Sequence, residues 1–148
     1  MKKLLLLLLL ISNVTFALPA TLTEYISKNP SWNTSDRASF SYITLRCGVL
    51  FEQISDFYKN RAESQETYKF SSKNATNFFR VSSDIYKTSC INFDCIKVEK
   101  KASQEKVKKW ESIYKEEMVN NINTYDEMIH GDIKSDFSTC KTKVKPVI

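Results

Sequence analysis

Apolar residues recur at helical spacing along most of this chain. The first long stripe begins near Ser35, and its members lie three or four positions apart: Phe40, Ile43, Cys47, Leu50, Phe51, Ile54 and Tyr58. A second apolar face of the same segment contains Tyr42, Leu45 and Val49. A helix that is apolar on two sides packs against several neighbours, so we expect this segment at the centre of the fold.

Two further long helices are predicted from the same spacing. One extends from about residue 64 to 86, and the other from an N-cap at Ser103 to Ile129, with residues 90–101 as the longest connection. The break before the first of these lies near Arg61 in a stretch without Gly or Pro, so a single double-length helix is the alternative. We prefer a hairpin, because each apolar stripe then covers the other.

The ends of the domain carry capping signals. Thr21 and Glu24 have the spacing of a capping box, which predicts a short helix that Pro30 prevents from continuing. His130 and Gly131 indicate the C-terminal end of the third long helix, after which Asp132 caps a last helix.

These segments define the fold class. The chain has only two glycines, and it contains none of the Asn-Gly or Asp-Gly pairs that typically turn β-hairpins. We therefore predict an all-α protein without strands: a small up-down bundle of about four helices, with a short N-terminal helix, stapled by disulfides.

The first 17 residues have the layout of a secretory signal peptide. Two lysines precede an unbroken apolar run from Leu4 to Ile11, and Ala17 supplies a small residue at the expected cleavage site. A retained membrane anchor is the alternative, but the run is shorter than the roughly 20 residues that span a bilayer. We predict a signal peptide at 1–17 and a single domain at 18–148, without a transmembrane segment in the mature chain, that is periplasmic or secreted.

Four cysteines lie in the predicted mature domain, and export favours their oxidation. Cys47 and Cys140 lie in the apolar stripes of their helices, at similar heights in an up-down bundle. Cys90 and Cys95 lie together, about 20 Å away along the bundle at 1.5 Å per residue. Because a bridge needs Cα atoms within about 7 Å, we predict Cys47 paired with Cys140 and Cys90 with Cys95. The main alternative pairs Cys47 with Cys90 and Cys95 with Cys140, and it requires the connection to fold back.

The mature domain is mildly basic. Removal of the predicted signal peptide leaves 20 basic residues against 17 acidic ones, a net charge of about +3, which does not favour nucleic acid as a partner. Six lysines form one run that ends at Trp110: Lys97, Lys100, Lys101, Lys106, Lys108 and Lys109. Such a run is most often a solvated face that keeps a domain soluble; the alternative is contact with an anionic lipid or cell-wall polymer, with Trp110 at the apolar border of the run.

Few residues suit catalysis or cofactor binding. His130 is the only histidine, and its place at a predicted helix end indicates a cap rather than a catalytic base. The cysteine spacing matches neither a zinc site nor a Cys-x-x-Cys redox pair, and two isolated glycines cannot form a phosphate-binding loop. We therefore predict no catalytic residue, no metal and no cofactor.

Two kinds of polar residue remain. Neighbouring carboxylates occur as Glu52 with Asp56, Glu116 with Glu117, and Asp126 with Glu127, and we interpret them as solvated helix faces. Asn121 falls inside the apolar stripe of the third long helix. A buried amide needs hydrogen-bond partners, so Asn121 is predicted to be a buried polar residue that fixes the helix register or marks a small polar pocket.

These observations favour an exported, non-catalytic helical protein that binds another protein or an envelope component. Two alternatives belong to other classes: a small envelope hydrolase that uses surface carboxylates, and a carrier of a small apolar ligand. The hydrolase requires two carboxylates that converge in a cleft, and the carrier requires a cavity lined by Phe and Tyr. A binding module requires neither.

Overall fold

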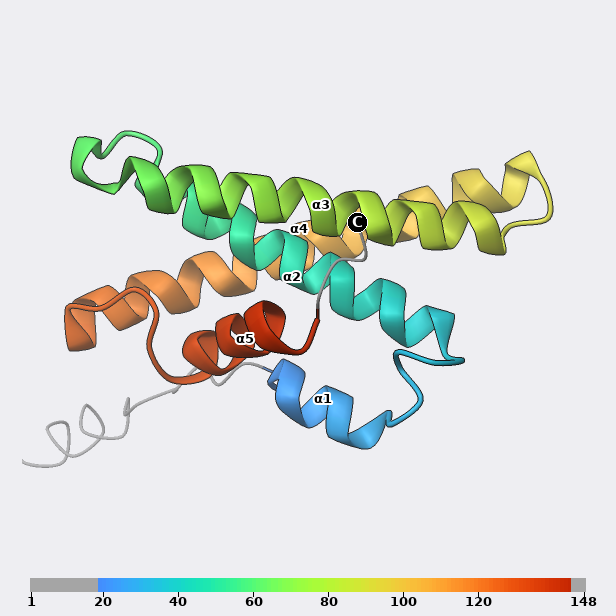
Figure 1. Cartoon of the computed structure of the whole chain (residues 1–148), viewed down its shortest axis with the longest axis horizontal. Coiled ribbons are helices and arrows are strands. Elements are labelled where there is room, and N and C mark those ends of the chain that lie inside the picture. Colours follow the sequence, from blue (N-terminus) through green and yellow to red (C-terminus); the bar gives the residue numbers. More distant parts are fainter. Residues whose placement is uncertain (1–18, 145–148) are drawn as a thin grey trace, which may run out of the picture.

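The fold is all-α, as predicted, and the part of the chain described by the computed structural model contains no strand. The structure describes residues 19–144, so the signal peptide predicted at 1–17 lies outside the described residues. Figure 1 shows the helices, which are α1 (Leu22–Lys28), α2 (Arg37–Tyr58), the short 3-10 helix η2 (Ala62–Ser64), α3 (Gln65–Ser89), α4 (Phe93–Tyr125) and α5 (Gly131–Thr142).

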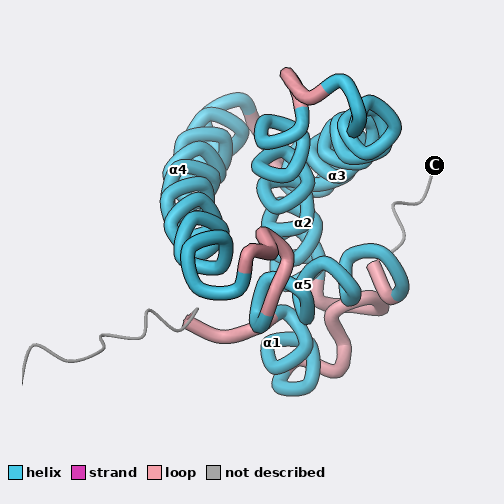
Figure 2. The backbone as a smooth tube through the Cα atoms, turned by 90° about the vertical axis from the view of Figure 1, so that its left-hand side faces the viewer, coloured by secondary structure: helices cyan, strands magenta, loops and turns pink. Residues whose placement is uncertain are grey.

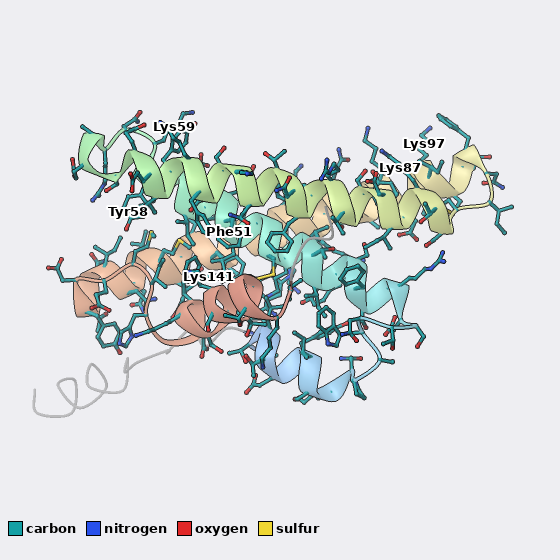
Figure 3. All side chains as sticks on the ribbon, viewed as in Figure 1. Phe51, Tyr58, Lys59, Lys87, Lys97 and Lys141 are labelled. Atoms are coloured by element: carbon teal, nitrogen blue, oxygen red, sulfur yellow. A yellow bond between two sulfur atoms is a disulfide. The ribbon has the colours of Figure 1, made fainter. Side chains whose placement is uncertain are left out.

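The predicted central helix is α2. Figure 2 shows α3 and α4 on opposite sides of α2, with α5 and α1 below it. Every residue from Ile43 to Phe51 is buried, because neighbours cover this helix on all sides. Phe51, labelled in Figure 3, stacks on Phe78 of α3 with ring centroids 5.7 Å apart and meets Phe137 of α5 edge to face at 5.6 Å. These aromatic contacts join three helices in one core.

The turn between α2 and α3 was predicted correctly near Arg61. The chain leaves α2 after Tyr58, makes one 3-10 turn and reverses direction without a glycine or proline. Gly48 of α2 allows the close approach of an aromatic ring from α3. A Cβ at Gly48 would lie 2.9 Å from the ring of Phe79, so it is the absence of a side chain that admits this ring.

The first two helices begin with side-chain caps. The Thr21 hydroxyl accepts from the amide of Glu24, and the Glu24 carboxylate accepts from the amide of Thr21, so the predicted capping box is present. Asp36 is the N-cap of α2, and its carboxylate accepts from the amide of Ser39 at 3.0 Å. These hydrogen bonds lower the pKa of Asp36.

The start of α4 was predicted wrongly. The helix begins at Phe93 rather than after Ser103, so the connection from α3 contains only three residues, Cys90 to Asn92. Asn92 is the N-cap, and its side-chain oxygen accepts from the amide of Cys95 at 2.9 Å. The lysine-rich segment has weak apolar periodicity but no helix breaker, and this local cap makes it the first part of α4.

The end of α4 was also predicted wrongly. The helix ends at Tyr125, where Asp126 adopts a left-handed conformation with φ 56° and serves as the C-cap. His130 is the N-cap position of α5, and Gly131 is its first residue with φ 51°. Asp132 lies in the first turn of α5 rather than at its cap. The His-Gly pair therefore starts the last helix instead of ending the previous one.

Two disulfides join the four cysteines, in the predicted pairing. Cys47 of α2 and Cys140 of α5 are both buried, and their Cα atoms lie 5.6 Å apart. Cys90 and Cys95, with Cα atoms 5.4 Å apart, close a small ring around the turn from α3 to α4. The first bridge ties the last helix to the central one, and the second holds the α3–α4 turn.

Candidate functional site

Exposed apolar side chains gather where α3 turns into α4. Ile91, Phe93 and Val98 are 99%, 77% and 66% exposed, which makes them the most exposed large hydrophobic residues of the described chain. We call residues 90–98 the tip. Figure 1 shows that this end of the α3–α4 hairpin projects beyond the N-terminal end of α2, so the rest of the domain does not cover it.

Lysines surround the tip and continue along α4. All six lysines of the predicted run are exposed on this helix. Figure 3 shows Lys87 of α3 and Lys97 of α4 at the same end of the molecule as the tip. Trp110, which was expected at the apolar border of the run, is instead buried at 4% exposure and packs inside the domain. The aromatic residue that accompanies the lysines at the surface is therefore Phe93.

An open trough lies between α3 and α4, with α2 as its floor. It consists of two hollows of about 300 and 440 Å³, and both are lined by Leu45, Tyr86 and Ser103. One hollow reaches the Cys90–Cys95 bridge, so the trough begins at the tip. Lys100 and Lys108 line one hollow and Lys106 the other, whereas the remaining lysines of the run do not line the trough.

A buried ionic network joins four helices on the other side of the core. The guanidinium of Arg46 on α2 contacts the carboxylate of Asp136 on α5 at 2.5 Å, with both side chains no more than 1% exposed. The hydroxyl of Tyr114 on α4 donates to the same carboxylate oxygen at 2.6 Å and accepts from Nε of Arg46 at 2.8 Å. The amide of Leu22 on α1 donates to the other carboxylate oxygen at 2.6 Å. The guanidinium also lies over the ring of Trp110, 3.7 Å from its centroid.

The electrostatics of this network suit a structural role. Burial raises the pKa of Asp136, and the charge of Arg46 and the three hydrogen bonds oppose that shift. Burial also raises the pKa of Tyr114 well above its usual value, so the hydroxyl keeps its proton and donates it to Asp136. Arg46, Tyr114 and Asp136 are enclosed by the core, so a substrate cannot reach them. The network fixes how α1, α4 and α5 meet α2.

Arg46 and Asp136 were not predicted as a pair, although a signal was present. Arg46 is the only charged residue in the apolar run from Phe40 to Phe51. Asp136 lies three positions after Ile133, on the buried side of its helix. A charged residue inside an apolar stripe needs a partner, and the two stripes contain charges of opposite sign.

The predicted carboxylate pairs lie at the surface. Glu52 and Asp56 line a shallow hollow of about 190 Å³, and Asp126 and Glu127 line another near Arg61. Partial burial, followed by the charges of Glu111 and Asp56, raises the pKa of Glu52. Burial likewise raises the pKa of Glu117, with smaller effects from Asp132 and Glu116.

Glu52 provides a pH-dependent prediction. Because its pKa is higher in the folded than in the unfolded chain, its contribution to stability is fully present below the unfolded pKa and is lost as the pH rises through the folded one. Glu52→Gln should therefore raise the free energy of unfolding at neutral pH and have little effect near about pH 4. Urea unfolding at both pH values measures this difference, with Glu63→Gln at an exposed position as the control. An equal effect at both pH values would contradict the assignment.

Asn121 and His130 both serve the connection from α4 to α5. Asn121 is 2% exposed, and its amide nitrogen donates to the carbonyls of Met128 and His130, each at 3.2 Å. The His130 ring stacks on that of Tyr125 with centroids 3.9 Å apart. The buried amide therefore satisfies backbone carbonyls of a turn rather than lining a pocket or contacting another long helix.

The described residues contain no group of three or more His, Cys, Asp or Glu side chains that would hold a metal ion. Among these residues, no helix combines the length and the apolar character needed to cross a bilayer. Comparison of the chain with protein families, with curated proteins and with solved structures gave no match. Its function is therefore inferred from the tip, the lysines and the trough alone.

Proposed function

We propose that this protein is an exported, non-catalytic binding protein that attaches to an anionic membrane surface through its tip. The observation that supports the proposal most directly is the exposure of Ile91, Phe93 and Val98 at a projecting, disulfide-closed turn. Large hydrophobic residues exposed together in a water-soluble domain mark a contact surface. Their position at the end of a hairpin suits shallow insertion into a bilayer rather than a flat protein interface.

The neighbouring lysines favour a membrane surface that is anionic. Lys87, Lys97, Lys100 and Lys101 lie on the helices that form the tip, with Asp84, Asp94 and Glu99 as nearby acidic residues, so the local charge is positive. Basic residues near an anionic leaflet contribute about 1 kcal/mol each, and salt weakens the attraction within a Debye length. The apolar residues would then anchor the tip while the lysines orient it.

Vesicle binding tests this attachment. The mature chain, residues 18–148, should bind vesicles that contain phosphatidylglycerol at low salt and should bind pure phosphatidylcholine vesicles much more weakly. The triple variant Ile91→Ser/Phe93→Ser/Val98→Ser should weaken binding at least about tenfold, because each apolar side chain contributes up to about 1.5–3 kcal/mol when fully buried. The matched control is Phe70→Ser/Val119→Ser, which removes two exposed hydrophobic residues away from the tip.

Two further measurements separate the contributions. Replacement of Lys100, Lys101, Lys108 and Lys109 by Gln should reduce binding at low salt and have less effect at high salt. Phe93→Trp should report insertion through a blue shift of its fluorescence, since the native Trp32 and Trp110 are buried at 8% and 4% exposure. Equal binding by the tip variant and its control would rule out insertion by the tip, and no binding by the parent chain would refute the proposal.

Export is the second part of the proposal, because it would place the tip beside a membrane and allow the disulfides to form. N-terminal sequencing of the secreted chain should begin at or near Leu18. Recovery of the uncleaved chain in the membrane fraction would instead identify the apolar run as an anchor.

A further inference from the structure

We propose that the trough between α3 and α4 binds a single long-chain carboxylate of the fatty-acid class. This inference goes beyond the proposed attachment and does not depend on it. It rests on the volume of the two hollows, the apolar part of their lining and the charges along their edge.

The two hollows of the trough overlap along the helix axes. On α4 one is lined between Cys95 and Lys106 and the other between Lys100 and Glu111, about 16.5 Å each at 1.5 Å per residue. Each of its two hollows, of about 300 and 440 Å³, falls within the range of small-molecule sites, about 300–1,000 Å³. A hollow of this length accommodates most of an extended acyl chain.

The lining is largely apolar and aromatic. It includes Tyr42, Leu45, Phe79, Ile85, Tyr86 and Val107. Two other hydroxyl groups of the lining are already engaged: Ser82 donates to the carbonyl of Ser41 at 3.1 Å, and Ser83 donates to the hydroxyl of Tyr86 at 3.1 Å. The apolar and aromatic part of the lining favours a hydrocarbon chain.

The charges along the edge of the trough indicate that the head group of the ligand is anionic. Arg37, Lys100, Lys106 and Lys108 line the trough, against Glu99 and Glu111, so cationic groups outnumber anionic ones. The long lysine side chains let the ammonium groups stay in water while their methylene groups cover the apolar wall. An amphiphile with one carboxylate satisfies both the apolar walls and the basic edge.

Titration with oleate tests this site on the intact mature chain, at concentrations at which oleate remains monomeric. Ser103 lines both hollows, so Ser103→Trp should fill the trough and weaken oleate binding at least about tenfold, or 1.4 kcal/mol. Ser112→Trp is the matched control, because Ser112 is an exposed residue of the same helix that lines no part of the trough. Circular dichroism establishes that both variants keep their helices.

A second pair of variants tests the head-group assignment. Lys100→Gln/Lys106→Gln/Lys108→Gln should weaken oleate binding roughly fivefold, since exposed ion pairs are individually weak. Lys97→Gln/Lys101→Gln/Lys109→Gln removes the same charge from lysines that do not line the trough and should have little effect. Oleyl alcohol, which has the same chain without the carboxylate, should bind about as well to the first variant as to the parent.

The outcomes separate this site from the tip. The Ile91→Ser/Phe93→Ser/Val98→Ser variant should lose vesicle binding and keep the oleate affinity of the parent chain. The absence of oleate binding, or equal affinity in the Ser103→Trp and Ser112→Trp variants, would overturn the assignment of the trough. Equal loss in the two lysine variants would show that the carboxylate responds to net charge alone and would overturn its placement at the edge.

Discussion

Asp136→Ala is expected to lower the free energy of unfolding by about 3–5 kcal/mol, because it leaves the buried guanidinium of Arg46 without its counter-ion. The variant also removes the acceptor of the Tyr114 hydroxyl and of the Leu22 amide. Each group would remain buried without a partner, which adds to the loss. Urea unfolding followed by circular dichroism measures the change.

Two controls keep this prediction testable even if Asp136→Ala does not fold. Asp84→Ala removes the exposed ion pair with Lys87 and should cost less than about 1 kcal/mol. The double variant Arg46→Met/Asp136→Leu removes both buried charges together and should be more stable than Asp136→Ala alone. A double variant no more stable than the single one would show that the penalty does not arise from the unpaired charge.

Replacement of Cys47 and Cys140 by alanine should lower the free energy of unfolding by about 4–5 kcal/mol in the loop-entropy description. The bridge joins residues 93 positions apart, so it removes much of the freedom of the unfolded chain. The Cys90→Ala/Cys95→Ala variant is the matched comparison. That bridge spans only five positions, and its loss should cost about 2 kcal/mol or less.

Denaturant unfolding of the two double variants, each with the other disulfide intact, checks the ranking. Peptide mapping without reduction confirms that the remaining bridge keeps its partners. An equal loss for the two variants would show that the long-range bridge is not the principal staple.

The long helix α2, with its strong apolar stripes, was predictable from sequence. The charged first turns of α4 were not. The segment of α2 was predictable because it has apolar residues on two faces. The capping box at Thr21 was predictable because it depends on only four consecutive positions. The first turns of α4 mix lysines and acidic residues with a few apolar ones and have no regular stripe, so their helical state depends on a local cap at Asn92. Periodicity carries no information about such a segment.

The candidate sites also differ in how far they could be predicted from sequence. The pairing of Cys47 with Cys140 followed from helix register, because both side chains face the core at a height fixed by their positions in the helices. The trough was not predictable, since it depends on how far α3 and α4 diverge on either side of α2. The ionic network was not predictable either, because Arg46 and its partner Asp136 lie 90 positions apart in the sequence.

The hydrogen bond from the Leu22 amide to Asp136 has a consequence for the timing of folding. It joins residues 114 positions apart in α1 and α5, and the Cys47–Cys140 bridge joins α2 to α5. Helix α1 therefore completes its contacts only after α5 has emerged. Contacts of high sequence separation slow folding because a long loop must close before they form. Until α5 has been synthesised, Arg46 has no carboxylate partner and α2 is not fully buried. The domain therefore cannot complete its core during synthesis.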